Sequence, residues 1–538
     1  MNPRLWLFLG LALLTLLRLW LIGSLELIQD EAYYHLWSKH PDICYYSKGP
    51  GVAWTIWLGT HCFGDTEFGI RFFSPVLSLG TSLLLFFFTR RLYGQSVAVW
   101  LTLGMNLLPI LHVGSVLMTI DPLSIFFWMA AIYTLWLALE PPNPKHDAEE
   151  GAEGDPGWSA WWPATGALIG MGFLCKWTNA MQLLSVVLLL CSSRKLRAHF
   201  RKPGFWSMLS VFLLFAIPPV LWNARHGWIT VMHVSQRGGL HQPFRLNLGE
   251  PFAYLGMHLG VYSPLLFGAC LVALGAALRK WRSHFKPRFL LSFTLPLFVM
   301  YGSLSLKKAG EPNWTAPAML SLGVFAAAYW HQRALQSQAV RRFFGVAFAL
   351  GLLLSIAILD LDLVRKAGIP IPRKADPSAR FRGWKTVAEE VAKIRSRLEK
   401  ETGHAFFLIA SDRGPASSLS FYLPEKPVEG PDHPPVYIPE SQNIENQFSF
   451  WPRYDEFIAL KPGQKPREPL FSEEAGINPF HGRSALYITE SEDENPPSSI
   501  QGAFAKTELI ACLDILRRDL RLRQVRIFRC DTYRSLSL

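Results

Sequence analysis

The sequence predicts an α-helical polytopic membrane protein that continues into a C-terminal water-soluble α/β domain. Of its 538 residues, 50% are hydrophobic and only 17% are charged, and the mean hydropathy is positive. The apolar residues gather into long runs up to residue 361, and beyond it the runs shorten to strand length. A soluble protein of this size would carry more polar residues, so we expect most of the chain to lie in a membrane.

A helix that spans a bilayer needs about 20 mainly apolar residues, and fewer when its flanking residues snorkel. The first run lacks a small-residue cleavage site, so we interpret it as an uncleaved helix and not as a signal peptide. The eleven predicted spans are Leu5–Leu21, Phe72–Phe88, Val97–Val113, Leu123–Leu139, Trp161–Leu174, Ala180–Cys191, Phe205–Trp222, Phe252–Leu278, Phe289–Leu306, Trp314–Trp330 and Phe343–Leu361.

The basic residues predict the orientation of these spans. With a cytoplasmic N-terminus, most Lys and Arg clusters fall in inner loops, as the positive-inside rule requires. These clusters begin at Arg4, Arg90, Arg194, Arg279 and Arg333. One inner loop, residues 140–158, is instead acidic and rich in Pro and Gly, which is typical of a disordered insert. An odd number of spans places the C-terminus outside.

We therefore divide the chain into a membrane domain, residues 1–361, and a periplasmic α/β domain, residues 362–538. The second is large enough for its own core. One helix carries Val387, Val391, Ile394 and Leu398 on a single stripe. The predicted strands are Ala405–Ala410, Leu419–Leu423, Val436–Pro439, Phe457–Leu460, Ala485–Thr489 and Val525–Phe528.

Cysteine positions and charge exclude some classes of protein. Four cysteines lie on the predicted outer side, where disulfides form, and the simplest of three pairings joins Cys44 to Cys62 and Cys512 to Cys530. No Cys and His spacing resembles a zinc site. The net charge is +12, but the cations lie in short loops and not on one amphipathic face. No nucleic-acid partner is therefore expected.

The first outer loop, residues 25–70, holds the first candidate site residues. Asp30 and Glu31 follow the first span, and neighbours on a helix point about 100° apart, so one can face a cavity while the other makes a structural contact. A solvated helix start would also explain both acids. Lys48 could bind a lipid phosphate as a point charge, or simply snorkel.

Further candidates lie in the later outer loops. Lys176 sits between two spans with almost no loop, and an ionisable residue at such a place is by default a functional candidate. Asp121 heads the fourth span, where helix capping alone would explain it. Arg237, Lys307 and Glu311 follow. Outer cations oppose the positive-inside trend, and a lipid phosphate held at the outer leaflet would account for them.

These residues fall into five motifs whose order resembles that of bacterial family 39-type glycosyltransferases. That family includes enzymes similar to dolichyl-phosphate-mannose–protein mannosyltransferases and to the lipid A aminoarabinose transferase. The motifs are Asp30-Glu31-x-Tyr33, Lys48-x-Pro50, Thr119-x-Asp121-Pro122-Leu123, Leu221-Trp222-Asn223-x-x-His226-Gly227-Trp228 and Glu311-x-Asn313-Trp314. The resemblance covers roughly residues 1–360. It implies a C-type glycosyltransferase fold, a catalytic Asp30 and a phosphate-binding Lys48. Gly49 and Thr315 stand where relatives often have Pro.

We expect transfer of a sugar from a polyprenyl-phosphate donor to an envelope acceptor (lipid A, another glycolipid or a protein), with inversion, at the outer face of a bacterial inner membrane. Asp30 would be the general base, supported by Glu31, Asp121 and Glu311. Lys48, Lys176, Lys307 and Arg237 would bind the donor phosphate. No cofactor is required, although the acids leave room for a divalent metal ion.

Two other functions compete with this interpretation. A transporter or flippase for a lipid-linked or anionic solute would share the near-membrane cations but would need charges along a path across the bilayer. A non-catalytic scaffold with a periplasmic binding domain would not need Asp30. The candidate charges gather on one predicted side, and no internal repeat is visible, which both favour the enzyme over the transporter.

Overall fold

The structure is a computed structural model that describes residues 3–534, except 141–157, 238–242, 244, 360–364, 366–367, 369–379, 428–432, 440, 442, 456–477, 479 and 518–519. It divides into two compact units: Met1–Gly23 with Asp42–Gly368, and Ser24–Pro41 with Ile369–Leu538. The predicted boundary at residues 361 and 362 lies outside the described residues, as does nearly all of the acidic loop. The segment Ser24–Pro41, which we had assigned to the membrane domain, groups with the second unit.

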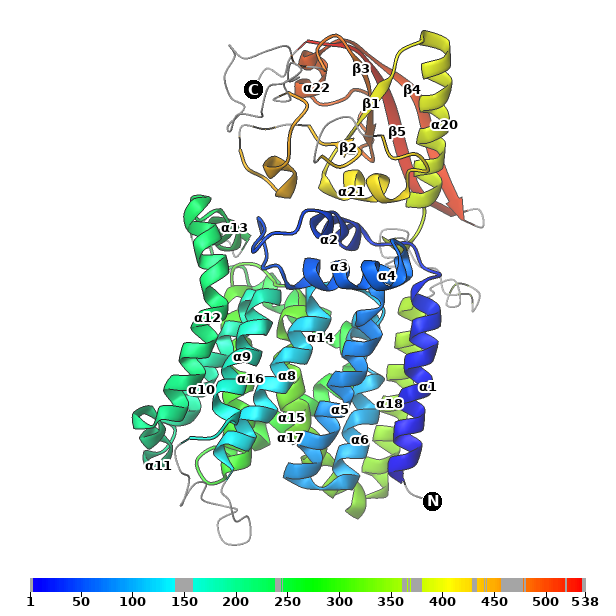
Figure 1. The fold of residues 1–538 in the computed structure, drawn as a ribbon. Coiled ribbons are helices and arrows are strands. Elements are labelled where there is room, and N and C mark those ends of the chain that lie inside the picture. The colour runs from blue at the N-terminus through cyan, green and yellow to red at the C-terminus, as the bar shows by residue number, and fades with distance from the viewer. Residues whose placement is uncertain are drawn as a thin grey trace. The chain divides into compact units, whose positions relative to one another are not determined.

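The first unit is a bundle of helices (Figure 1). Its helices are α1 (Pro3–Ile22), α3 (Gly51–Phe63), α4 (Glu67–Arg71), α5 (Phe73–Tyr93), α6 (Gln95–Asn106), α7 (Pro109–Gly114), α8 (Ile120–Leu139), α9 (Trp161–Cys175), η1 (Trp177–Ala180), α10 (Met181–Cys191), α11 (Arg194–Arg197), η2 (Ala198–Arg201), α12 (Pro203–Arg225), α13 (Ile229–Arg237), α14 (Gly249–Val261), α15 (Pro264–Lys280), α16 (Phe285–Ser305), η3 (Pro312–Thr315), α17 (Ala316–Gln336) and α18 (Gln338–Leu359).

The chain is a multi-pass membrane protein, but the predicted count of eleven spans is not confirmed. Among the described residues, six helices are long and apolar enough to cross a membrane, or seven when α14 and α15 count as one span bent by 115°. The predicted run Val97–Val113 is divided between α6 and α7, and α9 has only 15 residues. Apolar sequence continues through such breaks, so hydropathy alone does not reveal where a helix ends.

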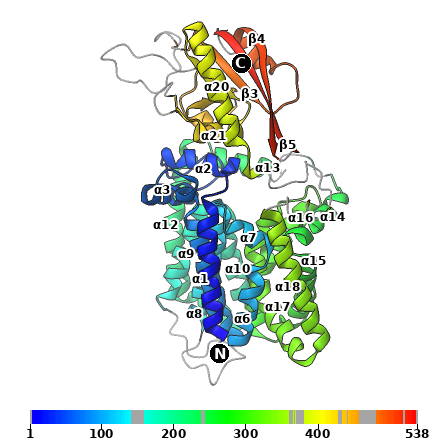
Figure 2. The same cartoon turned by 90° about the vertical axis from the view of Figure 1, so that its right-hand side faces the viewer.

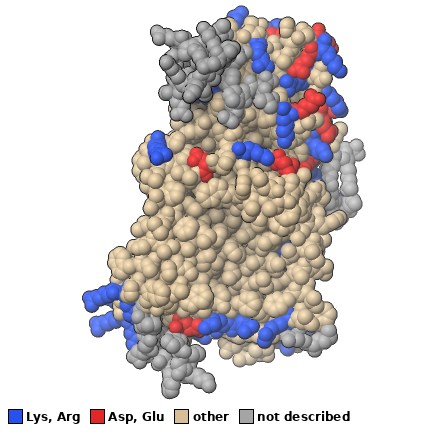
Figure 3. Space-filling view, viewed as in Figure 1, with Lys and Arg blue, Asp and Glu red and all other residues tan. Residues whose placement is uncertain are grey.

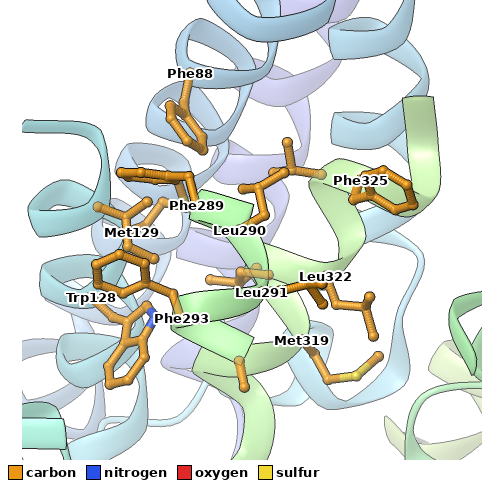
Figure 4. Packing of buried hydrophobic residues seen from close by; sticks show 14 of the residues in the cluster. Phe88, Trp128, Met129, Phe289, Leu290, Leu291, Phe293, Met319, Leu322 and Phe325 are labelled. Carbon is orange, nitrogen blue, oxygen red and sulfur yellow. The ribbon is translucent and has the colours of Figure 1, made fainter. Parts of the chain in front are cut away.

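Large apolar side chains from α5, α8, α16 and α17 form the core of the bundle (Figure 4). Phe88, Trp128, Met129 and Phe289 are all fully buried there. The outward faces are equally apolar, since Leu13 on α1 is 70% exposed. A surface of this kind is stable only against lipid, because water would not tolerate so large an apolar area.

On the face seen in Figure 3, the Lys, Arg, Asp and Glu side chains of the bundle gather at its ends, and the stretch between them is almost free of charged residues. At one end the loops that we predicted on the inner side touch one another. Arg4 hydrogen-bonds Gln95, and the Lys286 ammonium donates to the carbonyl of Leu92 at 2.7 Å. The candidate site residues of this unit lie at the other end, which confirms that the two sets of loops are separated.

The second unit contains a five-stranded sheet with the strand order β2-β1-β3-β5-β4. Strand β1 runs parallel to β2 and β3, whereas β5 runs antiparallel to β3 and β4. Its elements are α2 (Gln29–Lys39), α20 (Trp384–Thr402), β1 (Phe406–Ala410), α21 (Arg413–Tyr422), β2 (Val436–Tyr437), η6 (Gln447–Phe450), β3 (Ser484–Thr489), α22 (Ser498–Ala503), β4 (Phe504–Arg517) and β5 (Leu520–Tyr533).

This sheet confirms the predicted α/β class and corrects two of its elements. The stripe that begins at Val387 is buried on α20, as predicted. The predicted strand Leu419–Leu423 is wrong, because α21 covers it up to Tyr422. The edge strand β4 was missed, although it contains the apolar run 509–513. Most of its described side chains are exposed or half-buried. Phe457–Leu460 lies outside the described residues.

The predicted disulfides are also wrong, because all seven cysteines are free. Cys44 is buried while Cys62 is exposed. Cys530 lies opposite Thr507 on β4, and Cys512 lies opposite Arg526 on β5, so the two cysteines are not paired across the hairpin. A position on the same side of a membrane does not bring two cysteines within the bonding range of Cα atoms.

Candidate active site

A buried ion pair stands at the centre of the polar end of the first unit. The Lys176 ammonium lies 2.7 Å from one carboxylate oxygen of Asp121. The Asn313 side-chain amide donates to the other carboxylate oxygen at 2.8 Å. These residues come from the start of α8, the end of α9 and η3. Three distant segments therefore meet at Asp121, whose helix is capped not by Asp121 but by the Thr119 hydroxyl.

A second polar pair lies one helical turn behind the first. The Ser124 hydroxyl donates to the Asn179 side-chain oxygen at 2.5 Å, and the Asn179 amide donates back to the Ser124 carbonyl at 3.1 Å. Both residues are fully buried. Because Ser124 and Asn179 each lie three positions after a member of the ion pair, the two pairs together fix α8 against the turn that carries Lys176.

The segment that carries Lys48 packs on the same turn. A Cβ atom at Gly49 would lie 2.2 Å from the carbonyl oxygen of Leu174, so only glycine fits there. The Trp177 indole donates to the carbonyl of Ser47 at 3.3 Å. The structure therefore brings the backbone around Lys48 against the backbone around Lys176.

The motif that begins at Leu221 holds this segment from its other side. The Trp222 indole donates to the Asp42 carboxylate at 2.8 Å. The Asn223 oxygen accepts the Thr230 backbone N–H at 3.2 Å, and the Asn223 amide approaches the Cys44 sulfur at 3.8 Å. Burial raises the pKa of the Cys44 thiol to about 12. The motif was predicted from the sequence, but its structural role was not: its side chains hold the loop that carries Lys48 in place.

The other predicted site residues of this unit surround η3. The Arg237 guanidinium lies 5.9 Å from the ring of Trp314, next to Asn313. Lys307 is half-buried and Glu311 is exposed, and both belong to the turn that leads into η3. Asn313, which the sequence placed in a motif but not among the site residues, makes the side-chain contact to Asp121. Its partner could not be identified from sequence spacing.

Asp30 and Glu31 belong to α2 in the second unit, and their side chains differ as predicted. Glu31 is fully buried, and its carboxylate accepts the backbone N–H of Ile28 at 3.1 Å, which caps the helix. Asp30 keeps 53% of its side chain exposed and lies 3.6 Å from the guanidinium of Arg413 on α21. Glu31 thus has a structural role in this helix, while Asp30 is accessible to a reactant.

Arg413 is a functional candidate that the sequence did not reveal. Its guanidinium lies over the ring of Tyr33 at 4.7 Å, next to its contact with Asp30. Burial acts to lower the pKa of Arg413, but the neighbouring Tyr33 and Asp30 outweigh it, so the pKa is raised. Tyr33 in turn stacks on Phe448. The position of the Asp30 side chain therefore depends on α21 and η6, which follow it by hundreds of residues.

Among the residues that the structure describes, no three His, Cys, Asp or Glu side chains gather in a way that could hold a metal ion. Asp121 is occupied by Lys176 and Asn313. The Lys176 and Arg237 side chains place positive charge at this end of the unit.

Comparison with solved structures identifies the fold. The apo crystal structure of ArnT from Cupriavidus metallidurans aligns over 98% of both chains with a TM-score of 0.61 and 15% identity. The chain shares the fold of ArnT. The same protein bound to undecaprenyl phosphate aligns over 97% of this chain with a TM-score of 0.60. The C-type membrane glycosyltransferase fold implied by the motifs is thus confirmed.

Sequence comparisons agree with this fold. Residues 47–222 match the family model described as dolichyl-phosphate-mannose-protein mannosyltransferase. The lipid A galacturonosyltransferase RgtD of Rhizobium johnstonii is 23% identical over 61% of this chain and 65% of its own length. The undecaprenyl phosphate-alpha-4-amino-4-deoxy-L-arabinose arabinosyl transferase of Pseudomonas paraeruginosa is 28% identical over 60% of this chain. This chain spans 57% of the length of the latter.

Proposed function

We propose that the protein transfers a sugar from a polyprenyl-phosphate donor to an envelope acceptor, lipid A or another glycolipid or protein, at the outer face of a bacterial inner membrane. The proposal rests on one observation above all: the Lys48 segment, Lys176, Asp121 and Asn313 converge at one end of a fold shared with ArnT. The names of the relatives, which act on lipid A or use undecaprenyl-phosphate sugars, support the same substrate classes.

The reaction is a substitution at the anomeric carbon of the donor. The acceptor hydroxyl or amine attacks this carbon, the bond to the phosphate oxygen breaks, and the configuration inverts. The Asp30 carboxylate takes the acceptor proton as general base, a role to which its half-exposed side chain is suited. The electron pair of the broken bond stays on the polyprenyl phosphate, so no general acid is needed.

Cations stabilise the charge that develops on the leaving phosphate. Lys48 and Lys176 are assigned this role, with Lys307 and Arg237 in support. Lys176 is only 7% exposed and is already oriented by Asp121, so it reaches the phosphate without first being ordered. Asp121 and Glu311 act in orientation. No metal ion is required, because these side chains supply the positive charge.

Reconstitution tests the proposal. The full-length protein is placed in proteoliposomes with a radiolabelled polyprenyl-phosphate sugar and lipid A, and transfer is compared between the wild type and Asp30→Asn. We expect Asp30→Asn to lower the rate at least a hundredfold, as is typical for loss of a general base. Asp514→Asn is the matched control, because Asp514 has 48% of its side chain exposed and lies 3.3 Å from Arg521.

Transfer at the wild-type rate by Asp30→Asn would remove Asp30 from the mechanism. Movement of solute across the vesicle membrane without any sugar transfer would instead support the transporter alternative.

A further inference from the structure

A broken pair of helices, α14 and α15, packs beside η3. Its polar groups have no part in the proposed mechanism. Helix α14 ends at Val261 and α15 begins at Pro264, with a bend of 115° between them (Figure 2). Ser263 at the break has a φ of 66°, a left-handed conformation that costs a non-glycine residue free energy. The last turn of α14 carries His258 towards η3.

His258 is hydrogen-bonded to Thr315, the last residue of η3, which follows Asn313 by two positions. The His258 Nε2 atom lies 2.7 Å from the Thr315 hydroxyl, and its Nδ1 atom lies 2.8 Å from the carbonyl of Tyr254. His258 is 1% exposed and Thr315 is fully buried. The Tyr262 hydroxyl donates to the carbonyl of Pro312 at 3.1 Å. The last turn of α14 and Tyr262, which follows it, therefore hold the two ends of η3.

The direction of each hydrogen bond follows from the available protons. A carbonyl only accepts, so Nδ1 of a neutral His258 must carry the hydrogen and donate it to Tyr254. Nε2 then has a lone pair, and it accepts the hydroxyl hydrogen of Thr315. The Pro312 carbonyl, 3.0 Å from the Thr315 hydroxyl, is satisfied by Tyr262. Both imidazole nitrogens of His258 and the Thr315 hydroxyl therefore have partners when the imidazole is neutral.

We propose that Thr315 and His258 are positioning residues for the candidate active site. They fix η3 so that the Asn313 amide stays on Asp121, and Asp121 in turn holds Lys176. A rotation of η3 would release one oxygen of Asp121 and leave Lys176 free to shift. The inference rests on the proposed transferase function, because it assigns these residues to the same site, but its structural part can be tested without activity.

The experiment compares two substitutions at one position in the full-length protein. Thr315→Val keeps the shape of the side chain and removes the hydroxyl, whereas Thr315→Ser restores the hydroxyl. We expect Thr315→Val to lower kcat about tenfold with little change in KM, since Thr315 acts through Lys176, which is assigned to the charge that develops on the leaving phosphate in the transition state. Thr315→Ser should return kcat to within about twofold of the wild type.

A second threonine provides the control for burial. Thr294 on α16 is also fully buried, and its hydroxyl bonds the carbonyl of Leu290 in its own helix at 3.0 Å. Thr294→Val should leave kcat unchanged. If Thr315→Val does not fold, His258→Phe replaces it, because a phenyl ring keeps the stacking on Tyr262 but has no nitrogen. Wild-type kcat in the folded variant, or an equal loss in Thr294→Val, overturns the proposal.

A double-mutant cycle measured by melting temperature tests this inference independently of the proposed function. If Thr315 acts through Asn313, the double variant Thr315→Val/Asn313→Ala should melt no lower than the less stable single variant. Additive losses in melting temperature would refute the link whether or not the protein transfers sugar. Absence of transfer by the wild type with every donor tried would count against the proposed function alone.

Discussion

Removal of either member of the Asp121–Lys176 pair is predicted to destabilise the first unit by several kcal/mol. At 2.7 Å the direct attraction is about 6 kcal/mol for an effective dielectric constant near 20, most of which desolvation offsets. The larger cost is the charge left behind. The Lys176 side chain is only 9% exposed, and breaking a buried pair typically costs about 3–5 kcal/mol. Asp121→Ala leaves the Lys176 ammonium behind, so we expect the upper end of that range, about 5 kcal/mol. Lys176→Met leaves Asp121, which keeps 20% of its side chain exposed, and should cost about 3 kcal/mol.

A double-mutant cycle measures this quantity. Asp121→Ala, Lys176→Met and the double variant are unfolded reversibly in mixed detergent micelles, and the free energies of unfolding are compared. The double variant should be no less stable than Asp121→Ala, which corresponds to a coupling of about 3 kcal/mol or more. The control is the ion pair of Arg91 and Glu140, whose side chains are 47% and 19% exposed. We expect its coupling to stay below about 1 kcal/mol.

Additive losses at Asp121 and Lys176, with a coupling below about 0.5 kcal/mol, would refute the reasoning. They would mean that the two charges do not depend on each other in the folded protein, and that Lys176 is not oriented by Asp121.

Three further predictions concern single positions. Gly49→Ala should lower the melting temperature and sugar transfer together, since its Cβ would lie 2.2 Å from the Leu174 carbonyl, and wild-type behaviour would contradict the packing. Burial lowers the pKa of His433 to about 3, below its unfolded value near 6.5. The second unit should therefore lose at most about 1.4 kcal/mol per pH unit as the pH falls below 6.5. This slope, measured by hydrogen exchange, should weaken in His433→Gln. A maleimide at neutral pH should label the exposed Cys62 but not Cys44, whose pKa burial raises to about 12, and the labelled cysteine is identified by mass spectrometry.

The outline of the protein could be read from its sequence because the length and the period of an apolar run are local properties of the chain. The apolar runs located the helices of the bundle, and the shorter runs located β1, β2, β3 and part of β5. The count of spans could not be predicted, because a break such as that at Ser263 depends on what packs around it. The hydropathy of residues 252–278 is the same whether the helix is straight or bent.

For the candidate site too, the sequence predicted part of the answer and the tertiary structure supplied the rest. Residue type and loop position selected Asp30, Lys48, Asp121 and Lys176, because charged groups next to a membrane are costly and seldom lack a purpose. Which groups meet was decided only by the tertiary structure. Asp121 bonds Asn313, which lies 192 positions away, and hydrogen bonds of this kind depend on distances of a few tenths of an ångström that no spacing along the chain encodes.

The sequence by itself determined that the protein resides in a membrane, that its basic loops and its candidate site loops are separated, and that its last part folds around a sheet. Only the tertiary structure decided that Glu31 caps its own helix, that Gly49 packs on Leu174, and that the cysteines stay free. The physical reason is specificity: the hydrophobic effect is non-directional and any apolar neighbour satisfies it, whereas hydrogen bonds, ion pairs and disulfides require two particular groups to arrive at the same place.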